Sequence, residues 1–351
     1  MPDYTQLVLN NRRLGLPKAV VSPDLKSATV LTNEPWEYVD LYLARQGTAP
    51  ATEARFYWQQ SREFFNASIG LGLQAAPLCL YYSFMNATKA LLRARSVSFK
   101  EHHGVASWKL DASSKLIDLS VGIKIKTDGV LPALSHYYNE SERSNTHTLS
   151  DIFFNLPFIH RTYSLTNHPI KEIFIPLVRP SFVFDGASRA IRVMANLTAD
   201  YPDPRHCKNL PQSFDWHIAD GRYFLLSKQS AEISSTSDPT ADDLEKLICL
   251  AKRIREDVYY ISGMDTLWYA KAMPMERTRI QRQSTTLTLA AMHRLSEECR
   301  YHPKDMAECL QHKNNWLVSE FIRMSGVQFI DEIASEITGH QILRPNVRPA
   351  G

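Results

Sequence analysis

The chain has 351 residues, of which 44% are hydrophobic and 22% are charged. These proportions are ordinary for a globular protein with a substantial core, arranged as two domains or as one large one. The 40 basic and 37 acidic residues leave a net charge of +3. So small an excess argues against DNA wrapping by bulk charge, although it permits a local basic face.

The cysteines and the N-terminal sequence indicate the cellular compartment of the protein. Its five cysteines are scattered at Cys79, Cys207, Cys249, Cys299 and Cys309. An odd and scattered set in a long chain is not typical of a disulfide framework and favours a reducing compartment. Because the N-terminal segment also has no apolar stretch long enough for a secretory signal, we expect a cytoplasmic protein.

One uncharged segment is long enough to cross a bilayer. It runs from Phe64 to Thr88, but polar residues are spread through it, and Gly70, Gly72 and Pro77 interrupt it. This pattern favours the end of one helix, a turn and the start of a second, buried helix. We therefore expect no membrane span.

Helical periodicity is strongest in two regions near opposite ends of the chain. Apolar residues spaced by three and four predict a helix pair over residues 51–70 and 76–95, with Pro77 in a first-turn position. Similar spacing resumes near Ser284 and continues almost to the end. Residues 1–50 are expected to be irregular, because Pro17, Pro23, Pro35 and Pro50 punctuate them.

The middle of the chain contains strand patterns. Alternating apolar and polar residues over 117–126 predict a half-buried strand that ends at the Asp128-Gly129 turn. A short helix is expected over 148–158, capped by Thr148 or Ser150. Four further strand candidates are EIFIPLV (172–178), RYFLLS (222–227), VYYIS (258–262) and TLWYAKA (266–272).

Together these elements predict an α+β protein that is mainly α. We expect a helical bundle, built from the N- and C-terminal segments, with a small β-sheet inserted between them. The expected parts are an irregular segment over 1–50, a helical part over 51–110, a mixed α/β region over 111–280 and a C-terminal helical part over 281–345. These parts are expected to form one interwoven unit.

Several strong catalytic motifs are absent from the sequence. It contains no GxxxxGK[ST] phosphate loop, no GxGxxG after a strand, no HExxH and no GxSxG. We therefore expect no cofactor, and in particular no nucleotide cofactor.

Two Cys/His pairs near the C-terminus suggest a metal site. Cys299 with His302, and Cys309 with His312, have the i,i+3 spacing that places two zinc ligands on one helical face. The separation between the pairs is shorter than usual, however, and Pro303 breaks the helix between them. We favour two buried cysteines with two surface histidines, and keep a zinc-stabilised structural module as an alternative.

Four segments carry a family resemblance. They are PLCLYYSFMNATKALL (77–92) followed by His103-Gly104, LSDIFFNLPFIHRTYSLT (149–166), CRYHPKDM (299–306) and FIRMSGVQFIDEIASEI (321–337). In these segments the sequence resembles the YaaC-like family of bacterial proteins. That family has no agreed activity, so the resemblance implies no catalytic residue.

The tyrosine-rich segment carries a second, remote resemblance. Its tyrosine pair and the His103-Gly104 that follows look like one helix of HEPN-type domains, which are helical bundles often found in toxin, defence or RNA-related settings. Members that lack the active Arg-Asn-x-x-x-His pattern often serve in binding or assembly. Core packing is the simpler explanation for a tyrosine pair. The candidate binding residues are Tyr81, Tyr82, Asn86, His103, Arg300 and Tyr301.

HEPN-type ribonucleases pair an arginine with a histidine after four to six intervening residues. The histidine would act as general acid or base, and the arginine would stabilise the phosphorane charge. The two matches in this chain are Arg95 with His102 and Arg161 with His168. They are about as many as chance predicts, and neither arginine is followed by Asn. These four residues are the candidate catalytic residues.

Three functional hypotheses follow. The first is a cytosolic, non-catalytic interaction or RNA-associated component, with bacterial antiphage defence as its setting. The second is a HEPN-type, metal-independent endoribonuclease, and the third is the zinc-stabilised module. We favour a protein that is not an enzyme, expect a protein partner or a homo-oligomer, and keep RNA as a candidate partner.

Overall fold

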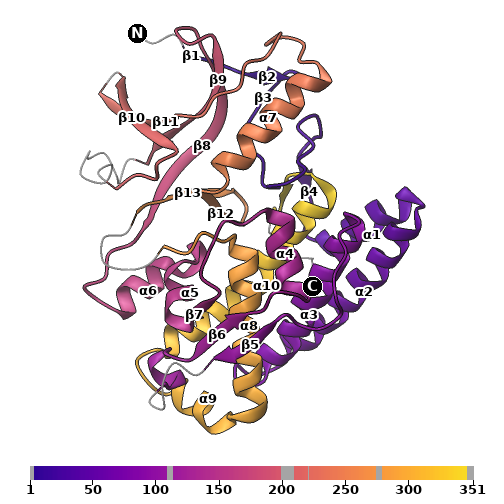
Figure 1. The fold of residues 1–351 in the computed structure, drawn as a ribbon, viewed down its shortest axis with the longest axis vertical. Helices are drawn as coiled ribbons and strands as arrows, with labels where there is room; N and C mark the ends of the chain where they lie inside the picture. Colours follow the sequence, from indigo (N-terminus) through magenta and orange to yellow (C-terminus); the bar gives the residue numbers. More distant parts are fainter. Residues whose placement is uncertain (1–3, 109–113, 199–208, 220, 274–278, 346–351) are drawn as a thin grey trace. The chain divides into compact units, whose positions relative to one another are not determined.

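The computed structural model describes residues 4–108, 114–198, 209–219, 221–273 and 279–345. The chain divides into two compact units, and each is built from segments that are distant in sequence. The helical unit comprises Glu34–Glu172 and Arg277–Thr338, and the sheet unit comprises Met1–Asn33, Ile173–Glu276 and Gly339–Gly351. Figure 1 labels the helices and strands of both units.

The helical unit contains long helices from both halves of the chain. Its α-helices are α1 (Pro35–Gln46), α2 (Ala49–Ile69), α3 (Ala76–Ala94), α4 (Val130–Tyr138), α5 (Leu149–Phe154), α6 (His160–Thr166), α8 (Ser284–Tyr301), α9 (Pro303–Cys309) and α10 (Asn315–Thr338). Two short 3₁₀ turns, η1 (Leu116–Asp118) and η2 (Pro157–Ile159), connect some of them. The predicted helix pair is confirmed as α2 and α3, and the predicted C-terminal helices as α8 to α10.

The core of the helical unit joins the N-terminal and C-terminal helices. Helix α3 lies beside α2 (Figure 1) and also packs against α8 and α10. Phe84 of α3 and Phe329 of α10 are both fully buried, and their rings stack with centroids 4.2 Å apart. A bundle formed from both ends of the chain was predicted, and these contacts confirm it.

A three-stranded sheet completes the helical unit. It has the order β5 (Val105–Trp108), β6 (Gly122–Ile125), β7 (Thr146–Thr148), and its strands are antiparallel. The strand predicted over 117–126 was too long, because Leu116–Asp118 forms a 3₁₀ turn and Leu119 follows in the left-handed region at φ 55°. Only Gly122–Ile125 continues as a strand, with Ile123 and Ile125 buried.

The sheet unit is built around a seven-stranded sheet among the described residues. Its strands are β1 (Tyr4–Gln6), β8 (Phe174–Asp185), β9 (Ala190–Leu197), β10 (Phe214–Ala219), β11 (Arg222–Ser227), β12 (Val258–Ile261) and β13 (Leu267–Lys271). The order along the sheet is β10-β11-β9-β8-β13-β12, β1 also pairs with β8, and all pairings are antiparallel. Two short pairs, β2 (Val8–Leu9) with β3 (Arg12–Arg13) and β4 (Val30–Leu31) with β14 (Ile342–Leu343), lie outside it.

The β part is sizeable, which corrects the prediction of a small inserted sheet. The candidates over 172–178, 222–227, 258–262 and 266–272 are confirmed as β8, β11, β12 and β13. Strand β8 extends to Asp185 because a bulge between Val178 and Ser181 accommodates Pro180. The sequence pattern stopped at this bulge and therefore missed the second half of β8 and its neighbour β9.

Two further segments differ from expectation. Residues 1–50 are not irregular throughout, because Pro35 begins helix α1 at a first-turn position that tolerates proline. Helix α7 (Ala241–Ile254) was not predicted, although Leu247, Leu250 and Ile254 form a buried stripe at helical spacing. None of the helices among the described residues has the length and apolar character that a membrane crossing requires.

Candidate functional site

Three aromatic side chains from distant segments meet inside the helical unit. Tyr81 of α3 and His293 of α8 are buried, and His103 reaches them from the loop before β5. The Tyr81 hydroxyl is hydrogen-bonded to Nδ1 of His103. His293 lies edge-on to Tyr81 with centroids 5.0 Å apart, and its ring is 5.4 Å from that of His103. We call these three residues the His–Tyr cluster.

A tight backbone crossing holds His103 in place. The His103 carbonyl accepts a hydrogen bond from the Leu131 N–H at 3.1 Å, at the start of α4. Gly104 then has φ +74°, and a Cβ there would lie 2.3 Å from Cδ of Pro132. Only glycine fits this position without strain, so the His103-Gly104 pair has a structural reason that does not depend on catalysis.

Both histidines of the cluster are held in the neutral form. Burial, with smaller effects of His103, Arg300, Arg294 and Lys126, lowers the pKa of His293 to about 3. Burial also lowers the pKa of His103, with added effects of Arg300, Lys89, His102 and Lys126. Burial raises the pKa of Tyr81 well above its ordinary value. At neutral pH the cluster is therefore an uncharged, hydrogen-bonded set beside several cations.

Three of these cations each lower the pKa of His103. We call them the basic cluster: Lys89, Lys126 and Arg300. Lys89 is held in an ion pair with Glu101. Neither Lys126 nor Arg300 pairs with a carboxylate among the described residues. The basic cluster therefore keeps two positive charges that no neighbouring acid neutralises.

Two exposed aromatic side chains accompany these charges. Tyr301 is 67% exposed, and the guanidinium of Arg300 lies 5.1 Å from the centre of its ring. Trp108 is 41% exposed, with the Lys124 ammonium 5.0 Å from its ring. Lys126 comes directly after the end of β6, two residues beyond Lys124, and is exposed.

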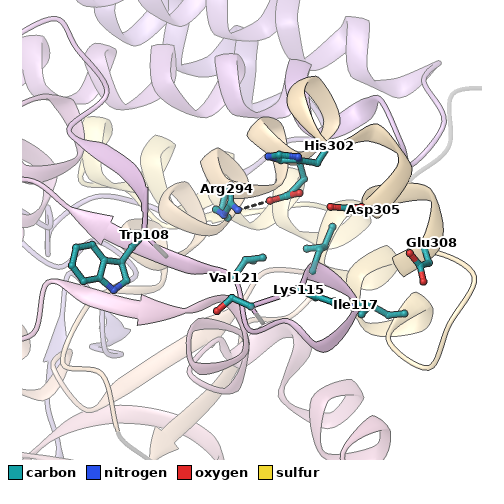
Figure 2. Close-up of a pocket in the computed structure, with 11 residues that line it drawn as sticks. Trp108, Lys115, Ile117, Val121, Arg294, His302, Asp305 and Glu308 are labelled. Carbon is teal, nitrogen blue, oxygen red and sulfur yellow. Dashed lines mark ion pairs between the residues drawn. The ribbon is translucent and has the colours of Figure 1, made fainter. Parts of the chain in front are cut away.

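A pocket of about 310 Å³ opens beside Trp108 (Figure 2). Leu116, Ile117 and Val121 provide its apolar lining. In Figure 2, Trp108 stands on one side and the α9 residues Asp305 and Glu308 stand on the other. The remaining polar lining consists of Ser114, Lys115, Arg294, Glu298 and His302.

An ion pair occupies the α8 side of this pocket (Figure 2). Glu298 is 2% exposed and pairs with Arg294, which also lies 3.2 Å from Glu297. Burial raises the pKa of Glu298, whereas Arg294 opposes this shift. The charge of Glu298 is therefore compensated within the protein, which leaves Asp305 and Glu308 as the pocket's exposed acids.

Comparison with known families identifies the chain. The family model described as YaaC-like Protein matches residues 26–337. The chain belongs to the YaaC-like family. The match covers almost all of the helical unit together with the middle segment of the sheet unit. No curated protein and no solved structure matches the chain, and the comparisons do not show the HEPN resemblance.

The candidate binding residues of the YaaC-like chain fall into two groups. Tyr81, His103 and Arg300 come together at the His–Tyr cluster, and Tyr82 stacks on Phe64 with centroids 5.3 Å apart. The Asn86 side chain instead donates to the Tyr82 carbonyl of its own helix, at 2.9 Å. Tyr301 stays at the surface beside Arg300, as described above.

Three of the four candidate catalytic residues have structural contacts of their own. Arg95 donates from Nε to the Glu336 carbonyl at 3.1 Å, whereas Nε2 of His102 lies 3.2 Å from Asp128. Arg161 is 62% exposed and its Nε lies 2.8 Å from a Glu172 oxygen. His168, exposed after the end of α6, is the fourth member. Their assignment to catalysis stays a prediction.

The four proposed zinc ligands do not form a metal site. No group of three or more His, Cys, Asp or Glu side chains among the described residues is arranged to hold a metal ion. Burial raises the pKa of Cys299 to about 12 and that of Cys309 to about 11, so both thiols stay protonated at neutral pH. The Cys309 Sγ contacts the Leu116 carbonyl at 3.7 Å. Cys207 lies outside the described residues, and the other four cysteines are free.

Sequence reasoning missed two residues of the site. His293 lies among the buried apolar residues of α8, and taken alone it is typical of an ordinary core histidine. Trp108 lies just before residues outside the described ranges, and no pattern marked it. A usable signal was present for His293, because Arg300 follows it by seven residues and therefore lies on the same face of α8.

Proposed function

We propose that this YaaC-like protein binds single-stranded RNA without cleaving it. The observation that carries the proposal is the combination of two exposed aromatic rings, Trp108 and Tyr301, with cations stacked beside them. Proteins that bind single strands combine aromatic side chains, on which bases stack, with a positive surface that follows the phosphates. Lys124, Lys126 and Arg300 supply that charge here.

The His–Tyr cluster itself is poorly suited to acid–base catalysis. A general acid or base works best with a pKa near the operating pH, whereas burial and nearby cations lower the pKa of both His103 and His293. The ribonuclease alternative relies on other histidines, His102 and His168. In the alternative ribonuclease hypothesis, Arg161 would stabilise a developing phosphorane. Its pairing with Glu172 neutralises the charge that this role requires.

Binding is tested by fluorescence anisotropy with a labelled single-stranded RNA over a range of salt concentrations. We expect Lys126→Gln and Arg300→Gln each to weaken binding, and each to reduce the slope of log affinity against log salt by about 0.7. Lys246→Gln, which removes an exposed lysine of α7, is the charge-matched control and should change neither quantity. No RNA binding at low salt by the unmodified chain would refute the proposal.

The same mixtures, run on a denaturing gel, test cleavage. We expect the RNA to remain intact with and without EDTA. Metal-independent cleavage that is lost in Arg161→Ala or His168→Ala would establish the ribonuclease alternative instead. An antiphage setting is tested separately, by phage challenge of cells that carry the unmodified chain or Arg300→Gln.

A further inference from the structure

We propose that the pocket beside Trp108 holds one guanine base of the bound RNA. This inference rests on the proposed function, because the base would belong to a strand whose phosphates lie along Lys124, Lys126 and Arg300. Trp108 connects the two places, since it lines the pocket and also stacks against Lys124. A strand held at Lys124 and Lys126 would therefore pass the opening of the pocket.

The size and apolar lining of the pocket fit a single planar group. Its volume of about 310 Å³ lies at the lower end of the range for small-molecule sites, roughly 300–1,000 Å³. Leu116, Ile117 and Val121 offer apolar surface to the faces of a ring, and Trp108 offers an aromatic one. Stacking of a base on such a residue contributes about 1–3 kcal/mol.

The charges around the pocket select a base over a phosphate. The lining contains three carboxylates, Glu298, Asp305 and Glu308, and the cations Arg294 and Lys115, so it carries no excess of positive charge. A phosphate inside would meet carboxylates, whereas the N–H groups of a base would donate to them. The phosphates therefore belong outside, at Lys124 and Lys126, and the base belongs inside.

The carboxylates also distinguish among the bases. Glu298 is already paired with Arg294, and Glu308 lies 3.9 Å from His312. Asp305 is exposed and pairs with no cation among the described residues. A carboxylate accepts two parallel N–H bonds, as it does from a guanidinium. Guanine is the base that presents two adjacent donors of this kind, N1–H and N2–H, so Asp305 favours guanine.

The test compares three labelled RNAs of equal length by anisotropy: all uridine, uridine with one central guanosine, and uridine with one central inosine. We expect the guanosine-containing RNA to bind at least about fivefold more tightly than the other two, because inosine lacks the N2 amino group. Asp305→Asn, which has one acceptor oxygen in place of two, should remove this preference, so that the three RNAs bind with equal affinity. Asp242→Asn on the exposed face of α7 is the matched control.

The outcomes separate failure of this inference from failure of the proposed function. Tight binding of all three RNAs with no guanosine preference would refute the guanine pocket and leave RNA binding intact. If no RNA binds, titration of free guanosine against tryptophan fluorescence, in the unmodified chain and in Trp108→Phe, tests the pocket alone. A Trp108-dependent signal from an arginine amide, but not from guanosine, would show a pocket for a peptide side chain and overturn the inference.

Discussion

His293 shows how burial determines the chemistry of a single residue. Only 3% of its surface is exposed, and Tyr81 and His103 pack directly against its ring. An imidazole in such a place resists protonation, because its charged form would lose hydration and face nearby cations. Position in the fold therefore determines the protonation behaviour of this side chain.

Acid should destabilise the protein through His293. The unfolded chain binds a proton at this side chain near pH 6.5, whereas the folded protein binds it only near a pKa of about 3. The stability contributed by the neutral ring is therefore fully present above about pH 6.5 and is lost as the pH falls toward 3. Between about pH 7.5 and 5 we expect a loss of roughly 2 kcal/mol from this residue.

Urea unfolding at the two pH values measures this effect. His293→Gln carries no titrating ring, so its free energy of unfolding should fall less over the same interval, whatever its stability at neutral pH. An equal pH dependence in the two proteins would show that His293 does not titrate in this way. The comparison isolates His293 because His103 and the other titrating groups are present in both chains.

Helix α5 shows how a short element is defined by its first residues. The Thr148 hydroxyl accepts the Asp151 N–H at 3.0 Å, and the Asp151 carboxylate accepts the Thr148 N–H at 3.2 Å. This capping box satisfies backbone N–H groups that have no partner inside the helix. The sequence pattern predicted the helix with Thr148 or Ser150 as its cap, and the structure assigns the cap to Thr148.

Loss of this cap should cost measurable stability. We expect Thr148→Ala to lower the free energy of unfolding by about 1 kcal/mol, since it leaves the Asp151 N–H without its acceptor. Thr52→Ala, at an exposed position in the first turn of α2, should change it by less than about 0.5 kcal/mol. Chemical denaturation of the three proteins makes the comparison, and equal stability of both variants would contradict the role of the cap.

Helix α7 is an element that the sequence pattern did not predict. Thr240 and Asp243 form a second capping box, and the buried stripe begins at Leu247, four residues after Asp243. The polar composition of residues 235–243 is typical of a loop, but the last three of these residues begin the helix. Helix α7 packs against strand β9, which the strand pattern did not identify.

At the scale of the whole molecule, the helical unit depends on contacts between the two ends of its chain. Phe84 and Phe329 are far apart in sequence and form one fully buried stack. Arg95 adds a hydrogen bond from the end of α3 to the Glu336 carbonyl of α10. These contacts mean that the N-terminal helices cannot complete their core without α10.

Truncation of Phe329 tests this dependence. We expect Phe329→Ala to lower the free energy of unfolding by about 3–5 kcal/mol, because it removes buried contacts and leaves a cavity against Phe84. Phe56→Ala is the control, since Phe56 is 55% exposed on α2. A small effect of Phe329→Ala in urea unfolding would contradict the position of this stack in a shared core.

The sequence alone determined the regular elements with strong local signals. Helices α2, α3, α8 and α10 and strands β11, β12 and β13 follow from apolar spacing, and the YaaC-like resemblance followed from segments distributed along the chain. The residues Tyr81, His103 and Arg300 could also be selected as candidates from their motifs. Local periodicity carries this information because each element must present one apolar face to a core.

Only the tertiary structure determined which residues surround Tyr81, His103 and Arg300. His293 joins Tyr81 and His103 because α8 packs against α3, and Trp108 lines a pocket with α8 and α9 because the β5–β6 pair lies beside them. The large sheet likewise depends on β8 continuing through its bulge to pair with β9. Such contacts join residues that are distant in the chain, so no pattern within one segment specifies them.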